Sequence, residues 1–212
     1  MNERVSELVN NELVNADSDI LLWINGHHTA WLDSFMWWMS YPLTWTPLYV
    51  LLIAAIGWRY RSWKTVLLVL LGFVIAVGLS DFIASGVFKP LVERLRPTRE
   101  PALDPLHLVR NCIGGKYGFC SSHAANSMAC ALLFSLIWRN KTVTASLMTW
   151  VTVTCYSRMY IGVHYPTDIM AGLLVGTLLA VLVYWGLRRW VLPSAELHSP
   201  REDDEVAPPG DS

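Results

Sequence analysis

Three short segments of the sequence carry the residues that could do chemistry. They run from Lys89 to Pro97, from Cys120 to His123 and from Ser157 to Asp168, and they include two histidines, three cations that we single out and a carboxylate four residues after a histidine. Arginine offers a planar fork of donors that matches phosphate oxygens, and lysine adds a point charge. The segments therefore predict a site for a phosphate group. The three cations are Lys89, Arg96 and Arg158.

The third segment supplies the reactive groups. His164 precedes Asp168 by four residues, and a carboxylate that accepts a hydrogen bond from one ring nitrogen leaves the other nitrogen exposed and more basic. We therefore predict His164 as nucleophile. His123 has no such partner in the sequence and is the predicted general acid, which protonates a leaving oxygen. The remaining histidines lack comparable neighbours and are interpreted as surface residues: His27, His28, His107 and His198.

The second segment leads into the amino end of a predicted helix. Free backbone N–H groups and the helix dipole favour an anion at such an end, and Ser121 and Ser122 add hydroxyl donors. Simple helix capping by a serine uses the same geometry. Capping and anion binding are therefore both open for this pair.

The elements that must position these residues are membrane helices. Hydrophobic residues make up 53% of the 212 positions and charged residues 16%, compared with about 25% charged residues in soluble domains. Five stretches are apolar and close to the roughly 20 residues that cross the hydrocarbon. We predict an all-α, polytopic membrane bundle with its site at one membrane face. The predicted spans are Trp31 to Trp58, Thr65 to Phe88, Ala124 to Trp138, Val143 to Tyr160, and Pro166 to about Leu187.

Both ends of the chain differ from this transmembrane domain, which we assign to residues 29–190. Residues 1–28 form a polar segment without the pattern of a cleavable signal, and Ile20 to Ile24 is predicted as a short interfacial helix. Residues 191–212 are acidic, rich in proline and predicted to be disordered. Within the first span, Pro42 and Pro47 predict a kink. After the second, Pro90 and Pro97 predict a turn.

Five crossings would place the connections alternately on the two sides of the membrane. One side holds seven basic residues without acids: Arg59, Arg61, Lys64, Arg139, Lys141, Arg188 and Arg189. The other also holds seven, but three of them belong to the predicted site, so four remain. Positive residues favour the cytoplasm, which places the loop from Pro90 to Ser122 outside. The four remaining cations are Arg94, Arg99, Arg110 and Lys116.

The spacing of these residues resembles that of a known family. Lys89 is followed after six residues by Arg96-Pro97, and Ser157-Arg158 is followed after five residues by His164 and after three more by Asp168. With Ser121-Ser122-His123 between them, these motifs resemble the type 2 phosphatidic acid phosphatase superfamily, which includes vanadium-dependent haloperoxidases. The middle motif departs from Pro-Ser-Gly-His, because Cys120 and Ser122 stand in the Pro and Gly places. Losing that glycine removes conformational freedom at the phosphate loop.

The resemblance covers about residues 79–181 and implies a helical bundle of the short bacterial type. It implies attack by His164 on phosphorus, a phosphohistidine intermediate, and protonation of the alcohol by His123. Lys89, Arg96 and Arg158 would stabilise the equatorial oxygens. No metal or other cofactor is implied, and the sequence holds no His or Cys cluster with zinc spacing and no all-carboxylate site.

The implied substrate is a lipid with an exposed phosphate, and the implied partners are membrane lipids rather than nucleic acid. Polyprenyl diphosphate, phosphatidate, phosphatidylglycerophosphate and the phosphates of lipid A all remain open. The implied location is the bacterial cytoplasmic membrane, with the site on the periplasmic side. Two alternatives are a non-catalytic transporter or binding protein for anionic lipids and a vanadate-dependent haloperoxidase, whose known architecture is soluble.

Two features of the outer loop remain open. Arg94, Arg99, Arg110 and Lys116 are interpreted as solvated charges, with recognition of a larger anionic headgroup as the alternative. Cys112 and Cys120 would bridge in an oxidising compartment or stay free. Cys130 and Cys155 fall inside predicted helices, where a small apolar residue suffices.

Overall fold

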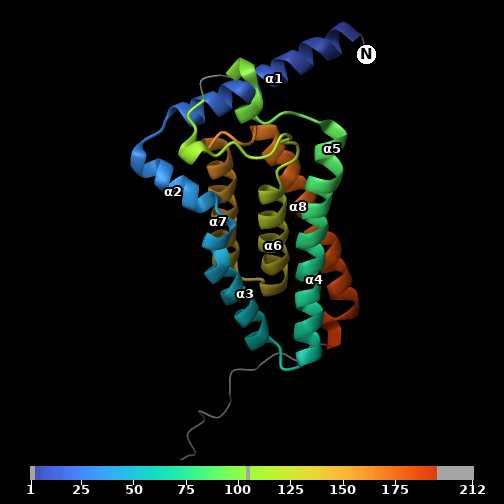
Figure 1. Ribbon diagram of the computed structural model, residues 1–212. Coiled ribbons are helices and arrows are strands. Elements are labelled where there is room, and N and C mark those ends of the chain that lie inside the picture. The colour runs from blue at the N-terminus through green and yellow to red at the C-terminus, as the bar shows by residue number, and fades with distance from the viewer. Residues whose placement is uncertain (1–2, 104–105, 195–212) are drawn as a thin grey trace, which may run out of the picture.

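The computed structural model describes residues 3–103 and 106–194, which form a bundle of helices (Figure 1). Helices make up 81% of the structure, and within the described residues the only β pairing is an isolated bridge between Leu95 and Tyr117. This confirms the predicted all-α class. The long helices are α1 (Glu3–Gly26), α2 (Ala30–Ser40), α3 (Thr46–Arg59), α4 (Trp63–Asp81), α6 (Ser122–Trp138), α7 (Lys141–Tyr160) and α8 (Pro166–Trp190).

Helix α6 forms the centre of the bundle and packs against α4, α7 and α8. Its contact with α8 is the closest, because Gly172 and Gly176 lie directly against the carbonyl oxygens of Ser121 and Ala125 and leave no room for a Cβ. Small residues four apart are typical of membrane helices whose backbones approach closely. This packing fixes the start of α8 beside the start of α6.

Two helical segments are long and apolar enough to cross a membrane. One is α8, and the other is a continuous run of 30 residues, Trp63–Val92, in which the π-helix η2 (Phe82–Phe88) and the short α5 (Lys89–Val92) extend α4. Helices α2 and α3 would add a third span if the bent pair is one crossing, with a bend of 72°. The predicted kink lies there, at the 3-10 turn η1 (Pro42–Trp45).

Five crossings therefore remain a prediction. Helices α6 and α7 run beside α4 and α8 in Figure 1, but within the described residues they do not meet the criteria of length and apolarity for a span. Both bury polar side chains against their neighbours, including Ser127, Ser135 and Thr154. Helix α6 is enclosed by other helices and has less need of apolar surface, whereas α7 also exposes polar residues such as Thr149 and Thr152.

The turn predicted between Pro90 and Pro97 is present at Glu93, whose φ is 52°, but the helix continues to Val92, past its predicted end at Phe88. A prolyl ring clashes with the carbonyl of residue i−4 in a regular α-helix. The wider π-helical turn of η2 directly precedes Pro90 and accommodates the ring there. The other predicted helix ends agree with the observed ends of α6, α7 and α8 to within three residues.

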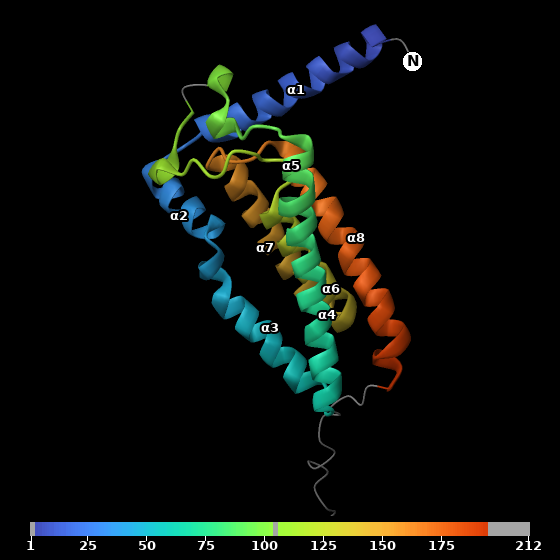
Figure 2. The same ribbon diagram turned by 45° about the vertical axis from the view of Figure 1, so that its right-hand side comes forward.

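The amino-terminal helix α1 is much longer than the predicted segment from Ile20 to Ile24. It lies across one end of the bundle in both views (Figures 1 and 2). Leu21 and Ile24 are buried, whereas Ile20 and Trp23 are exposed, so this part of the helix is amphipathic. At the other terminus, the 3-10 turn η6 (Leu192–Ser194) occupies the start of the predicted disordered tail, whose residues 195–212 lie outside the described residues.

Candidate active site

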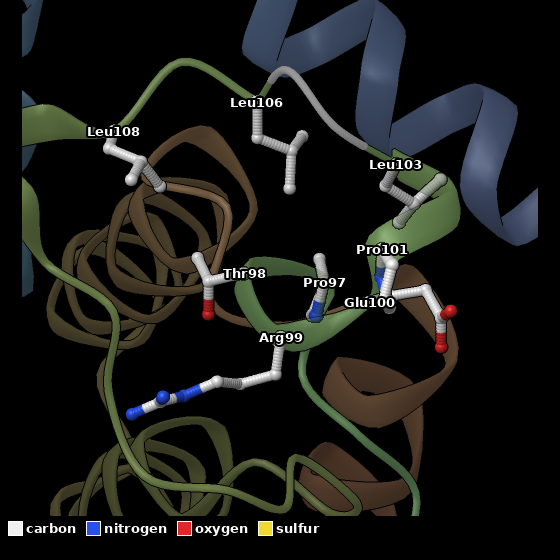
Figure 3. A pocket seen from close by; sticks show the side chains of 8 residues that line it. All are labelled: Pro97, Thr98, Arg99, Glu100, Pro101, Leu103, Leu106 and Leu108. Carbon is white, nitrogen blue, oxygen red and sulfur yellow. The ribbon is translucent and has the colours of Figure 1, made fainter.

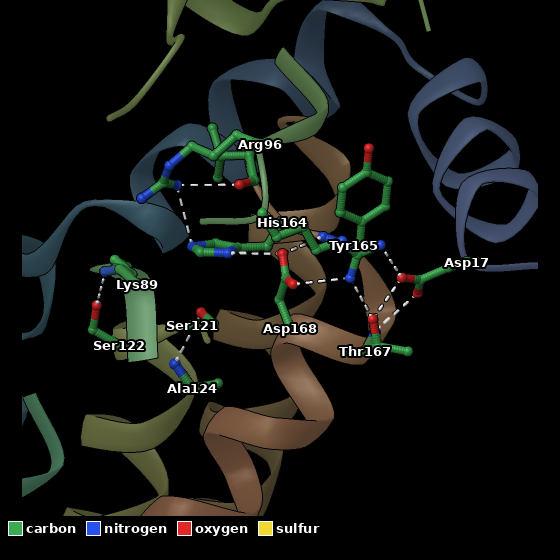
Figure 4. A network of polar contacts seen from close by, with 12 residues as sticks. Asp17, Lys89, Arg96, Ser121, Ser122, Ala124, His164, Tyr165, Thr167 and Asp168 are labelled. Atoms are coloured by element: carbon green, nitrogen blue, oxygen red, sulfur yellow. Dashed lines mark hydrogen bonds and ion pairs between the residues drawn. The ribbon is translucent and has the colours of Figure 1, made fainter. Parts of the chain in front are cut away.

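The end of the bundle beneath α1 holds the residues that the sequence singles out, and Figure 4 shows most of them, including Lys89, His164 and Asp168. Lys89 lies on α5, Arg158 in the last turn of α7, and Ser121 caps the start of α6. His164 precedes α8, and Asp168 lies in the first turn of that helix. Four helix ends therefore bring these side chains to one face, and Lys89 and Arg158 lie at the same end of the bundle.

His164 and Asp168 lie side by side in the interior. The Nδ1 atom of His164 is 3.4 Å from the Oδ2 atom of Asp168, and the two side chains are 1% and 0% exposed. Asp168 Oδ2 also accepts a hydrogen bond of 3.0 Å from the backbone N–H of Tyr165. A Cβ at Gly118 would lie 3.0 Å from the same oxygen. The lack of a side chain at Gly118 thus makes room for the carboxylate.

The other ring nitrogen of His164 faces a cation. Arg96 Nη1 lies 3.2 Å from His164 Nε2 and also donates to the carbonyl of Val163 at 3.1 Å. A guanidinium group has N–H donors and no acceptor, so Nε2 must accept in this contact. We therefore assign the proton to Nδ1, on the side of Asp168. This tautomer leaves Nε2 with a free electron pair beside a phosphate-binding cation.

A serine pair holds Lys89 at the edge of the same site. Lys89 Nζ donates to Ser122 Oγ at 2.8 Å and to Ser85 Oγ at 3.0 Å, and the two hydroxyl oxygens are 3.0 Å apart. Ser122 stands where the family pattern has glycine, so this departure adds a hydroxyl that fixes the lysine. Ser121 is fully buried and caps α6 by accepting from Ala124 N–H at 3.5 Å. Capping, one of the two readings left open, is present.

Arg158 is buried and hydrogen-bonded to the hydroxyl of Ser40 at the end of α2. Two cavities meet at His123. One is lined by Arg158, Ser40 and Cys112 among others, and the second extends along α6 and α7. His123 thus lies between the cavity that Arg158 lines and a second space within the bundle.

The surroundings of His164 disfavour its charged form. Burial lowers the pKa of His164 well below its usual value near 6.5, and the positive charges of Arg158, Arg96 and Lys89 lower it further. The imidazole is therefore neutral at pH 7. A neutral imidazole among three cations can act as a nucleophile toward an anion that those cations bind.

A second ionic network binds the other carboxylate oxygen of Asp168, Oδ1. Arg94 Nη1 donates to Asp168 Oδ1 at 3.1 Å, and Arg94 Nη2 lies 2.6 Å from Asp17 Oδ2 on α1. Asp17 also accepts from the N–H and hydroxyl groups of Thr167, at 2.9 and 2.5 Å. The interpretation of Arg94 as a solvated loop charge is therefore wrong. Sequence analysis does not identify Asp17, because its ionic partner lies 77 residues away.

Two histidines interpreted as surface residues belong to a polar cluster. His107 Nε2 lies 2.9 Å from Asp33 Oδ2, and the His28 ring stacks on His107 with centroids 3.6 Å apart. Possible ligand atoms of these three residues lie within 4.8 Å of one another, a grouping that sequence spacing does not reveal. Tyr160 also donates to Asp33 at 2.7 Å. His27 is exposed, as predicted, and His198 lies outside the described residues.

The outer loop contains a separate cavity of about 250 Å³ (Figure 3), formed by loop residues that include Pro97, Arg99 and Leu108. None of the predicted catalytic or phosphate-binding side chains lines it. Cys112 and Cys120 are both free thiols, and Cys120 is fully buried beside Ala84 and Ala125. The structure therefore shows no disulfide between them.

Comparisons with known proteins place this geometry in a family. The chain is 32% identical over 191 residues to the lipid A 4'-phosphatase of Porphyromonas gingivalis, covering 88% of this chain and 80% of the relative. It is 31% identical over 166 residues to the lipid A 4'-phosphatase of Bacteroides thetaiotaomicron, covering 77% and 73%. The fold is similar to that of a transmembrane PAP2-type phosphatidylglycerolphosphate phosphatase from Bacillus subtilis. That structure has a TM-score of 0.65 at 24% identity, over 85% of this chain and 88% of that one.

A sequence model of the PAP2 superfamily matches residues 65–191, which include every residue predicted for the site. This confirms the resemblance found in the motifs. The chain therefore belongs to the PAP2 superfamily.

Proposed function

We propose that this membrane phosphatase hydrolyses a lipid phosphate through a phosphohistidine intermediate on His164. The observation that carries the proposal is the position of His164, with Asp168 at one ring nitrogen and Arg96 at the other. Lys89, Arg96 and Arg158 would bind the phosphate oxygens. Ser121 and Ser122 would contribute donors at the amino end of α6.

The proposed reaction has two steps. His164 Nε2 attacks phosphorus, the bond from phosphorus to the lipid oxygen breaks, and His123 gives that oxygen a proton. Water then attacks the phosphohistidine and gives a proton back to His123, the bond from phosphorus to Nε2 breaks, and inorganic phosphate leaves with Nε2 free again. The fixed cations stabilise the charge on the equatorial oxygens in both steps.

The lipid A 4'-phosphatases among its relatives support a phosphate of lipid A as the substrate. A site at the end of a membrane bundle lets the acyl chains remain in the bilayer while the phosphate reaches the cations. The distribution of basic residues supports a place in the bacterial cytoplasmic membrane, with the site on the periplasmic face.

Phosphate release by the purified protein in detergent, with a metal chelator present, tests this function. We expect release from lipid A by the wild-type protein and by His27→Ala, which changes an exposed histidine. His164→Ala should lose at least 1,000-fold in kcat, because it removes the nucleophile. Undiminished release by His164→Ala would refute the role of that residue. Binding without release would support the alternative of a non-catalytic lipid-binding protein.

A further inference from the structure

A cavity of about 250 Å³ extends from the phosphate site into the bundle. It lies between the bent segment that joins α2 to α3 and the facing sides of α4, α6 and α7. His123 lines it, as do Asp81, Asn126, Trp150 and Thr154. The predicted general acid therefore separates the phosphate cations from this space, and a leaving group protonated by His123 would lie within it.

Three residues that line this cavity each carry a buried polar atom with no hydrogen-bond partner among residues 3–103 and 106–194. These atoms are Asn126 Oδ1, Trp150 Nε1 and Thr154 Oγ1. Trp150 and Thr154 are only 6% and 4% exposed. Buried polar atoms are normally paired, because leaving them unpaired costs free energy. The wall therefore offers an acceptor, a donor and a hydroxyl to an occupant that can hydrogen-bond.

A carboxylate adds to this polarity. Asp81 lies within the continuous helical segment Trp63–Val92, where ionisable residues are costly and mark functional sites. Its Oδ1 atom accepts a hydrogen bond of 3.1 Å from Asn126 Nδ2. An ionised carboxylate accepts hydrogen bonds and repels anions. The occupant that suits this wall therefore carries O–H or N–H donors and no negative charge of its own.

Aromatic rings also line the cavity. The ring of Trp150 lies 5.7 Å from that of Trp45 and 6.0 Å from that of Tyr49, measured between centroids, and all three residues line the cavity. Tryptophan and tyrosine combine an apolar face with a polar edge. Together with the polar atoms, these faces suit a compact ring that has both C–H surface and hydroxyl groups.

We propose that this cavity is a leaving-group subsite that binds the sugar from which the phosphate is removed. The assignment rests on the proposed phosphatase function, because it places the leaving oxygen at His123. The hydroxyl and amide groups of the sugar form hydrogen bonds with Asp81, Asn126, Trp150 and Thr154. A diacylglycerol leaving group lacks those donors, and a polyprenyl phosphate leaving group carries charge toward Asp81.

The specificity of matched variants tests the subsite. We compare kcat/KM for lipid A, phosphatidate and a polyprenyl diphosphate in the wild-type protein, Thr154→Val and Asn126→Leu. Each variant should lose about tenfold or more on lipid A and change less than about twofold on phosphatidate, since polar groups in a site discriminate for substrates that pair with them. Thr152→Val is the control, because Thr152 lies on the same helix but is exposed and bonds the carbonyl of Met148.

Three results would overturn the subsite. Equal losses of kcat/KM on lipid A and phosphatidate would show that the two residues have only a structural role. Unchanged kinetics in both variants would show that water, and not the sugar, pairs with the polar atoms of the wall. The third is a wild-type preference for phosphatidate over lipid A. Thr154→Ser should restore activity on lipid A, which separates a lost hydroxyl from a misfolded variant.

A binding measurement separates failure of the subsite from failure of the proposed function. Dephosphorylated lipid A, added to the detergent-solubilised protein, should raise the melting temperature of the wild type and raise it less in Asn126→Leu. This shift requires no turnover. An absent shift in a wild-type protein that releases phosphate would remove the subsite alone. A shift that Asn126→Leu lacks, in a protein that releases no phosphate from any lipid, would remove the proposed function alone.

Discussion

His164 lies between groups of opposite charge, and its two nitrogens therefore differ. Asp168 faces Nδ1 at 3.4 Å, and the guanidinium of Arg96 faces Nε2 at 3.2 Å. The first distance exceeds that of an ordinary hydrogen bond, and catalytic hydrogen bonds often shorten only when substrate binds. An incoming phosphate would take over the donors of Arg96 and free Nε2 for attack.

The charge state of His164 gives a prediction about pH. Because burial and the three cations lower its pKa below the usual value of 6.5, the imidazole should stay neutral as the pH falls through 6.5. Nitrogen-15 NMR of histidine-labelled protein in micelles should find its titration midpoint below 6.5. Arg96→Gln should raise that midpoint, because it removes a charge that opposes protonation. A midpoint at or above 6.5 in the wild type would contradict the neutral nucleophile.

Arg94 offers a second prediction for a single residue. Arg94→Gln removes the cation shared by Asp17 and Asp168, leaving two buried carboxylates without their ionic partner. We expect kcat to fall about tenfold with little change in KM, because Asp168 then orients His164 less well. Arg94→Lys should recover part of the activity. Arg99→Gln, at an exposed position of the same loop, is the control.

A fall in melting temperature with unchanged kcat would show that Arg94 is only structural. The motifs could not reveal this residue, because its partners come from α1 and α8 and sequence spacing carries no sign of their contact. The sequence does identify Lys89, Arg96, His164 and Asp168. Each of them lies within a few residues of another residue with a reactive or charged side chain.

At the level of elements, helix ends do most of the positioning. Asp168 lies three residues after the N-cap of α8 and binds the N–H of Tyr165, so the residue that faces His164 also caps its helix. Ser121 N–H donates to the carbonyl of Asp168 at 3.0 Å. The starts of α6 and α8 are therefore joined directly, and the close packing of the two helices maintains the site.

Glycine substitutions on α8 test this packing. Gly176→Ala places a methyl group against the carbonyl of Ala125, whereas Gly186→Ala meets nothing within 4 Å. We expect the first to lower stability by about 1–3 kcal/mol through overpacking. The second should be neutral or stabilising by up to about 1 kcal/mol, because alanine favours a helix over glycine. Equal melting temperatures for the two variants would contradict a close contact between α6 and α8.

Element boundaries were largely predictable, and the exceptions have local causes. Apolar runs located α6, α7 and α8, and Ser121 and Pro166 mark the starts of α6 and α8. The helix before the turn at Glu93 ends later than predicted, because the π-helical turn that precedes Pro90 has no recognised sequence signature. The sequence pattern does not predict the length of α1, because polar residues interrupt the apolar face that Leu21 and Ile24 present to the bundle.

For the whole molecule, the all-helical class follows from composition, whereas the number of crossings does not. Helix α6 is enclosed by its neighbours and carries alanine, serine and cysteine where a lipid-facing helix would carry larger apolar residues. High hydropathy identifies helices whose large apolar residues face lipid, so it does not identify an enclosed helix such as α6. The cavity beside His123 could not be predicted either, because α3, α4, α6 and α7 each supply part of its wall.

The orientation in the membrane gives a prediction at this scale. In a cysteine-free variant, single cysteines at Glu100 in the outer loop and at Lys141, the first residue of α7, should report opposite sides of the membrane. A maleimide that cannot cross the inner membrane should label the first in intact spheroplasts and the second only after lysis. The basic residues that flank α3, α7 and α8 favour the cytoplasm at that end. Labelling of Lys141→Cys without lysis would reverse the orientation.

The most direct test is to trap the enzyme during turnover on lipid A labelled with phosphorus-32 at the phosphate that is removed. Rapid quenching at alkaline pH should yield a labelled protein that loses its phosphate in acid, as a phosphoramidate does, with the label on the peptide that contains His164. His164→Gln should show no label, and His123→Gln should accumulate less of it. Labelling of another residue, or hydrolysis by wild-type protein with no phosphoprotein at any time, would contradict His164 as the nucleophile.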